Sequence, residues 1–90
     1  MINKFEFPET VSIEFYKYCK GEEDPLFYDC QNVRDSRSAA DAIVSGILKE
    51  YSFVEMRGNQ YELIYRGHMD TEVMLKVLAD KFKEPLALRA

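Results

Sequence analysis

The segment FPETVSIEFYKYCKG, residues 7–21, decides the fold because it fits two kinds of secondary structure. Val11, Ile13 and Phe15 alternate with polar residues, and the segment is rich in β-branched and aromatic residues. Both features are typical of a half-buried strand. Val11, Phe15 and Tyr18 also fall at helical spacing, which leaves a helix as the alternative. We favour the strand.

The strand interpretation predicts three strands in the first third of the chain, at residues 4–7, 11–19 and 26–30. A turn at Pro8 separates the first two, and the acidic Gly21–Pro25 segment turns the chain back for the third. Pairing across that second turn would set Cys19 opposite Cys30 and Lys20 opposite Asp29.

The second half reads as a helix that feeds a hairpin. Ser38 and Asp41 have the spacing of a capping box. The apolar stripe that follows is formed by two columns, one of Ala40, Val44 and Leu48 and one of Ile43, Ile47 and Tyr51. Gly46 costs about 1 kcal/mol in a helix relative to Ala, so it would mark a close packing contact.

Two further strands and a last helix follow. The predicted strands cover residues 53–56 and 61–65, with Gly58-Asn59 supplying the positive backbone angles of a tight turn. Asp70 or Thr71 would cap the last helix, and Pro85 would end it.

The predicted fold is therefore α+β: a single domain with a small antiparallel sheet and two helices packed on one face, in the order ββ(β)αββα. If residues 10–19 are helical, the order of elements becomes that of a winged helix instead.

The charge of the chain is uneven. The net charge is −4 over 90 residues, and residues 1–30 carry three basic side chains against seven acidic ones. The first third would therefore repel nucleic acid or attract a basic partner. No stretch reaches the roughly 18 apolar residues of a membrane span, and the N-terminus lacks the layout of a secretory signal. Two cysteines fit free thiols in a reducing compartment, so we expect a cytoplasmic protein that does not contact membranes.

The sequence offers little for catalysis or cofactors. His68 is the only histidine and has no partner motif, so we interpret it as a structural or exposed loop residue. Cys19 and Cys30 are too few for a zinc site, and Glu22-Glu23-Asp24 lacks the ligand spacing of a calcium loop. No Gly-rich phosphate loop or nucleophile motif is present. We expect no enzyme, no metal and no cofactor.

The aromatic first third is the best candidate for a partner surface. Neighbouring rings in a strand point to opposite faces, so some of these rings must face outward. The candidate partner-binding residues are Tyr16, Tyr18, Glu22, Glu23, Phe27 and Tyr28. They indicate a small regulatory, accessory or inhibitor-like protein that binds a protein partner or itself, and its size and acidity would suit a phage- or plasmid-encoded regulator.

A second candidate surface lies at the start of the first helix. Free amides, two guanidinium groups and two hydroxyls there could bind a phosphate or carboxylate. The residues are Arg34, Ser36, Arg37 and Ser38. A capped helix with solvated arginines explains the same residues, and both interpretations stay open.

Residues 36–66 resemble the recognition helix and wing of winged helix-turn-helix proteins. The matching run is Leu48 to Glu55, then Arg57-Gly58-Asn59, then Tyr61-Glu62-Leu63. The resemblance implies duplex DNA binding, with the helix in the major groove. The residues it assigns to DNA contact are Ser36, Arg37, Ser38, Ala42, Ser45, Lys49 and Arg57.

Overall fold

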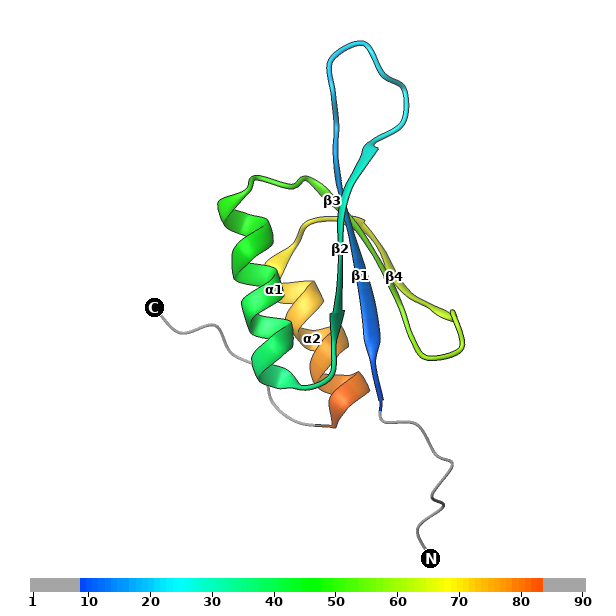
Figure 1. The fold of residues 1–90 in the computed structure, drawn as a ribbon, viewed down its shortest axis with the longest axis vertical. Coiled ribbons are helices and arrows are strands. Elements are labelled where there is room, and N and C mark those ends of the chain that lie inside the picture. The colour runs from blue at the N-terminus through cyan, green and yellow to red at the C-terminus, as the bar shows by residue number, and fades with distance from the viewer. Residues whose placement is uncertain (1–8, 84–90) are drawn as a thin grey trace, which may run out of the picture.

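The structure is a computed structural model that describes residues 9–83. Over that range the chain forms strands and helices in the order ββαββα (Figure 1). The strands are β1 (Val11–Lys17), β2 (Leu26–Val33), β3 (Phe53–Arg57) and β4 (Leu63–His68), and the helices are α1 (Ser36–Leu48) and α2 (Thr71–Phe82). The segment that decides the fold is a strand, which confirms the predicted α+β architecture. The strand predicted at residues 4–7 lies outside the described residues.

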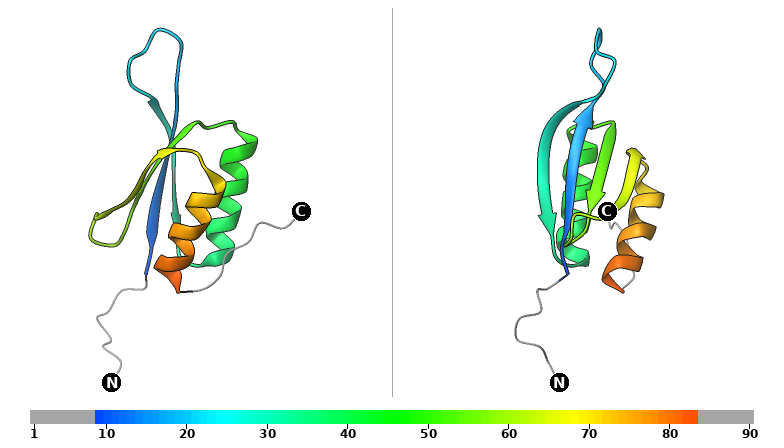
Figure 2. Two further views of the ribbon diagram at one scale, coloured as in Figure 1. Left: turned by 180° about the vertical axis from the view of Figure 1, so that it is seen from behind. Right: turned by 90° about the vertical axis from the view of Figure 1, so that its right-hand side faces the viewer.

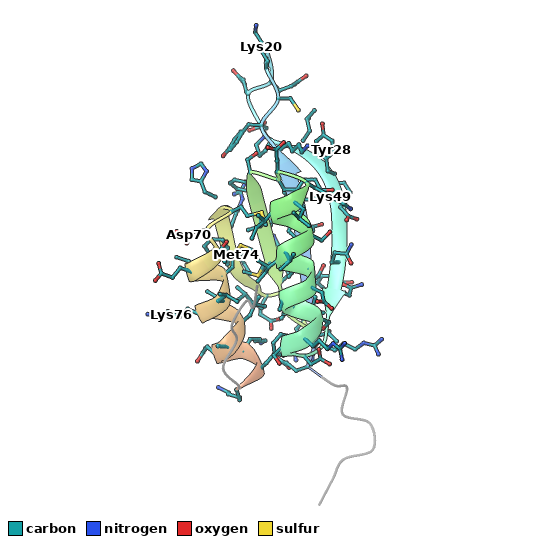
Figure 3. All side chains as sticks on the ribbon, turned by 90° about the vertical axis from the view of Figure 1, so that its left-hand side faces the viewer. Lys20, Tyr28, Lys49, Asp70, Met74 and Lys76 are labelled. Carbon is teal, nitrogen blue, oxygen red and sulfur yellow. The ribbon has the colours of Figure 1, made fainter. Side chains whose placement is uncertain are left out.

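The strands form one antiparallel sheet in the order β2-β1-β3-β4. β1 and β3 are therefore central, and β2 and β4 are the edges. Both helices lie on the same side of the sheet: they stand in front of the strands in Figure 3 and behind them in the right-hand panel of Figure 2.

The alternation of β1 builds one half of the hydrophobic core. Val11, Ile13 and Phe15 are at most 1% exposed, and they face the helices because alternate side chains of a strand share a face. Met74 and Leu78 of α2, four residues apart, lie in the same core. The other members of the core are Val33, Ala39, Ala42, Ile43, Val54 and Met56.

A long loop joins β1 and β2. β1 ends at Lys17, opposite Leu26, and residues 18–25 project beyond the sheet (Figure 1). The predicted pairs Cys19–Cys30 and Lys20–Asp29 are therefore wrong, because each pair has one member in the loop. Both cysteines are free.

β2 runs three residues beyond its predicted end at Cys30 and contains a bulge. Phe15 is opposite Asp29, but the next residue, Tyr16, is opposite Phe27. Tyr28 is the extra residue. A bulge of this kind re-aims the side chains that follow it, and here it places Phe27 beside Tyr16.

The N-cap of the first helix lies three residues before the predicted cap, Ser38. Asp35 is the N-cap: its carboxylate accepts a hydrogen bond from the Ser38 amide at 2.8 Å, and the Ser38 hydroxyl accepts from the Asp35 amide at 3.2 Å. The capping box with Ser38 as N-cap and Asp41 as its partner is therefore wrong. Ser38 belongs to a capping box, but as its third helical residue.

The buried face of α1 also differs from the predicted stripe. Ala39, Ala42, Ile43 and Gly46 face the core, whereas the predicted column residues Val44, Ile47 and Leu48 are 39%, 44% and 77% exposed. Apolar residues cover most of the circumference of α1, so periodicity does not select a face. The small residues do, because they let the helix approach the sheet closely.

The predicted close contact at Gly46 is present. A Cβ atom there would lie 2.6 Å from Met69 Cε and 2.7 Å from Phe15 Cε1. Such distances leave no room for a side chain, so α1 sits on the sheet at a separation that only glycine allows at this position.

The β3–β4 connection differs from the predicted tight turn at Gly58-Asn59. It spans residues 58–62. The Gly58 amide donates a hydrogen bond to the Glu62 carbonyl, and the Gly58 carbonyl accepts one from the Tyr61 amide, each at 3.0 Å. The positive φ angle falls on Tyr61 (61°), and neither Gly58 nor Asn59 has one. The predicted turn geometry is therefore wrong.

The start of α2 is as predicted. Asp70 is its N-cap and accepts from the Val73 amide at 3.2 Å, and Glu72 lies in the first turn. The helix ends at Phe82, and Lys83 adopts the left-handed conformation of a C-cap. The predicted stop, Pro85, lies outside the described residues. Neither α1 nor α2 has the length and apolar character needed to cross a membrane, among the residues that the structure describes.

Candidate functional site: the open face of the sheet

One face of the sheet has no helix over it within residues 9–83 (Figure 2). Because Val11, Ile13 and Phe15 point toward the helices, Ser12, Glu14 and Tyr16 of β1 point the other way. We call this side, with the cross-strand neighbours of Ser12, Glu14 and Tyr16, the open face.

Strand pairing brings one ring from each strand into a row across the open face. Tyr16 of β1 is opposite Phe27 of β2 and Phe53 of β3, and Phe53 is opposite His68 of β4. Tyr16 meets Phe27 and Phe53 edge to face, each with ring centroids 5.8 Å apart. Phe53 and His68 are 6.5 Å apart. Cross-strand aromatic pairs of this kind also stabilise the sheet.

Tyr18 and Arg66 extend this aromatic row. The Tyr18 ring lies 6.0 Å from Phe53 and 5.9 Å from His68, and the guanidinium carbon of Arg66 lies 5.7 Å from the Phe53 ring. The row is open to solvent: Tyr18 is 49% and Phe27 56% exposed. Large apolar side chains left uncovered in a cluster are a mark of interaction surfaces.

A second row, next to the rings, is centred on two carboxylates. Glu14 is opposite Glu55, and Glu55 is opposite Arg66. Arg57 forms a salt bridge with Glu55. The Tyr16 hydroxyl donates to Glu14 at 3.4 Å.

These carboxylates affect the aromatic row. The pKa of Tyr16 is raised, first by burial and then by the charges of Glu14 and Glu55. Each of these effects disfavours the phenolate. The charge of Arg66 opposes them and lowers this pKa.

The predicted partner-binding residues fall into three places. Tyr16, Tyr18 and Phe27 lie together on the open face. Glu22 and Glu23 are exposed in the loop that joins β1 and β2, whose tip carries the labelled Lys20 in Figure 3.

Tyr28 is on the helix side of the sheet. Its ring lies 6.1 Å from Tyr51, which itself stacks on the buried Phe15. Lys17 Nζ lies 5.4 Å from the Tyr28 ring. Tyr28 is 50% exposed, but it faces away from Tyr16 and Phe27, so the predicted opposition of Phe27 and Tyr28 holds.

Several charged and aromatic residues of the open face are not among the predicted site residues, notably Glu14, Phe53, Glu55 and Arg66. His68, which the sequence predicts in a loop, is the last residue of β4. The alternation of Phe53 with the buried Val54 was the available signal for the third strand. Nothing local indicated that β4 continues as far as His68.

The predicted anion site at the start of α1 already contains a negative group. The Asp35 carboxylate takes the hydrogen bond of the Ser38 amide, which lowers the pKa of Asp35. Arg34 and Arg37 are exposed beside it. An external anion would therefore compete with Asp35 for the same amide.

The residues that the winged-helix resemblance assigns to DNA are spread over the molecule. Ala42 is 6% exposed and packs in the core. Lys49 is the C-cap of α1, at the opposite end from Arg37. Arg57 lies on the open face, with the sheet between it and α1. DNA binding through this set stays a prediction.

No group of three or more potential metal ligands occurs among the described residues. Comparisons of the chain with models of protein families, with curated proteins and with solved structures found no match. The geometry of the open face is therefore the basis for any functional argument.

Proposed function

We propose that this chain is a small, non-enzymatic regulatory protein, accessory or inhibitor-like, that binds a protein partner or a second copy of itself through the open face. The observation that carries the proposal is the aromatic row formed by Phe27, Tyr16, Phe53 and His68, one ring from each strand. Tyr and Phe are enriched at protein interfaces, where they bury large apolar areas.

The acidic loop supports the same proposal. Glu22, Glu23 and Asp24 lie in the loop that joins the two strands carrying Tyr16 and Phe27, and all three are exposed. The loop projects past the sheet (Figure 1), and it joins the strand ends at Lys17 and Leu26, each adjacent in sequence to a ring of the aromatic row. In this arrangement the rings supply affinity by burying apolar area, and the acids select a basic surface and speed the encounter.

Phe27 and Tyr28 provide a matched pair for testing the proposal. They are adjacent aromatic residues of one strand with similar exposure, 56% and 50%, and they lie on opposite faces. Full burial of a Phe side chain contributes about 1.5–3 kcal/mol. Since about half of the Phe27 surface is still available, Phe27→Ala should weaken a complex by about 0.75–1.5 kcal/mol, or roughly 4- to 12-fold.

The experiment measures self-association by sedimentation velocity, and partner association by co-purification from native cells, for the wild type and both variants. We expect Phe27→Ala to weaken the dimer or the co-purification by this factor and Tyr28→Ala to leave it unchanged. Equal behaviour of the two variants, whether both lose the complex or both keep it, would contradict the proposal.

A further inference from the structure

The charges on the open face are divided between its two halves. Both arginines of the open face lie in the half formed by β3 and β4. Arg57 is on β3 and forms a salt bridge with Glu55, and Arg66 is on β4. Glu14, on β1, forms no salt bridge with any of the described residues. The half of the face formed by β1 and β2 therefore keeps an uncompensated carboxylate.

The β3–β4 half shows how this surface accommodates a cation. Arg66 lies with its guanidinium 5.7 Å from the Phe53 ring and is the cross-strand neighbour of Glu55. A guanidinium is attracted by the negative face of an aromatic ring, and its planar shape allows it to stack while its N–H groups bind a carboxylate. Ring, carboxylate and cation are all present in this half.

The β1–β2 half has the ring and the carboxylate without the cation. Glu14 accepts a hydrogen bond from the Tyr16 hydroxyl, and Tyr16 meets Phe27 edge to face. Among the described residues, no cationic side chain stacks on Tyr16 or Phe27. Lys17, the nearest lysine in sequence, is directed to Tyr28 and Tyr51 on the helix side.

We infer that the protein partner presents an arginine side chain to this half of the open face, where its guanidinium stacks on Tyr16 or Phe27 and pairs with Glu14. This inference rests on the proposed function. The acidic loop adds to the charge complementarity, because residues 18–25 carry Lys20 against Glu22, Glu23 and Asp24. A basic segment that crosses the aromatic row would meet acids on both sides of it.

A single-stranded nucleic acid is the competing occupant for a sheet with exposed rings, since bases stack on aromatic side chains. Such binding also needs a positively charged path for the backbone. Glu14 and the acidic loop place negative charge there instead, which favours the basic protein segment.

The experiment is an amide chemical-shift titration of the ¹⁵N-labelled protein with a short peptide containing two arginines. A twin peptide in which citrulline replaces both arginines keeps the shape and removes the charge. Glu14→Gln tests the carboxylate, and Glu72→Gln, an exposed glutamate of α2, is the control for the same change of net charge. Circular dichroism verifies that both variants are folded.

We expect saturable shifts centred on Glu14, Tyr16 and Phe27. The citrulline peptide and the Glu14→Gln variant should each bind about tenfold more weakly, as expected for the loss of a charged hydrogen bond worth about 1.5 kcal/mol. Glu72→Gln should bind as the wild type does. Shifts confined to the acidic loop, or no shifts at millimolar peptide, would overturn the inference.

Two further outcomes separate this inference from the proposed function. If Phe27→Ala abolishes a native complex while Glu14→Gln leaves it unchanged, the open face is an interface and the arginine site is wrong. If a single-stranded thymidine oligonucleotide shifts the same amides and displaces the peptide, the occupant is a nucleic acid and the inference is likewise overturned.

Discussion

The substitution Gly46→Ala tests the packing that fixes the fold, because two opposing effects meet at this position. In an exposed helix, Ala would stabilise the protein by about 1 kcal/mol relative to Gly. Here the new Cβ would lie 2.6 Å from Met69 Cε and 2.7 Å from Phe15 Cε1. Overpacking of a core typically costs about 1–3 kcal/mol.

The mobility of Met69 and Phe15 decides whether Gly46→Ala stabilises or destabilises the protein. Met69 Cε is the end of a flexible side chain and can rotate away. The Phe15 ring is 1% exposed and stacks on Tyr51 with centroids 5.1 Å apart, so it has little room to move. We therefore place the overpacking cost at about 2–3 kcal/mol. The net effect is a loss of about 1–2 kcal/mol in the free energy of unfolding. Each kcal/mol lost lowers Tm by about 4–8 °C in a domain of this size.

Urea unfolding followed by circular dichroism measures this loss as a lower midpoint with an unchanged slope. The control is the same substitution in a Phe15→Leu background, where the ring edge that the new methyl group would meet is absent. In that background Gly46→Ala should be neutral or stabilising by up to about 1 kcal/mol, which corresponds to a coupling of about 1–3 kcal/mol between the two positions. A gain of about 1 kcal/mol in the wild-type background would refute the close seating of α1 on the sheet.

Three other predictions concern the stability of single elements. Asp70→Ala removes the N-cap of α2 and should cost about 1 kcal/mol in urea unfolding; no change would show that the cap is dispensable. Glu14→Gln should stabilise the sheet by about 0.2–1 kcal/mol, because like charges directly opposite each other destabilise a pair of strands and Glu14 faces Glu55; a loss of stability would contradict this. A hydrogen bond from Lys81 lowers the pKa of Glu62 below its ordinary value of 4.5. The stability that this pair contributes is therefore fully present above pH 4.5 and is lost as the pH falls through the lowered pKa. The difference in stability between the wild type and Lys81→Met should therefore be seen at neutral pH and vanish in acid, and a difference that is independent of pH would exclude the ion pair as its cause.

Local signals sufficed for the elements of the fold. The alternation of Val11, Ile13 and Phe15 reflects a strand with one buried face, and Asp70 caps α2 because its short side chain reaches an amide in the first turn. The start of α1 was harder, because Asp35 and Ser38 are both good capping residues. They form one capping box together, and only the path of the chain after β2 decides which of them is the N-cap.

The membership of the open face depends on register, which periodicity does not contain. Alternation predicts that Phe27 and Tyr28 point to opposite sides, and they do. It does not say which of the two joins Tyr16. With Phe15 opposite Asp29, a regular ladder would pair Tyr16 with Tyr28. The bulge pairs Tyr16 with Phe27 instead and leaves Tyr28 with Tyr51 and Lys17.

The two faces of the sheet follow different rules, and the contrast supports a binding role for the open one. On the covered face, every fully buried side chain is apolar and no buried polar group occurs among the described residues. On the open face, Glu14 stands opposite Glu55. Large rings also remain in solvent there, although Thr or Lys would make unwanted association of the sheet less favourable. Local choices that conflict with stability are expected where a protein meets its partner. Glu14 is the clearest of these, since a neutral residue there would relieve the repulsion without disturbing the core.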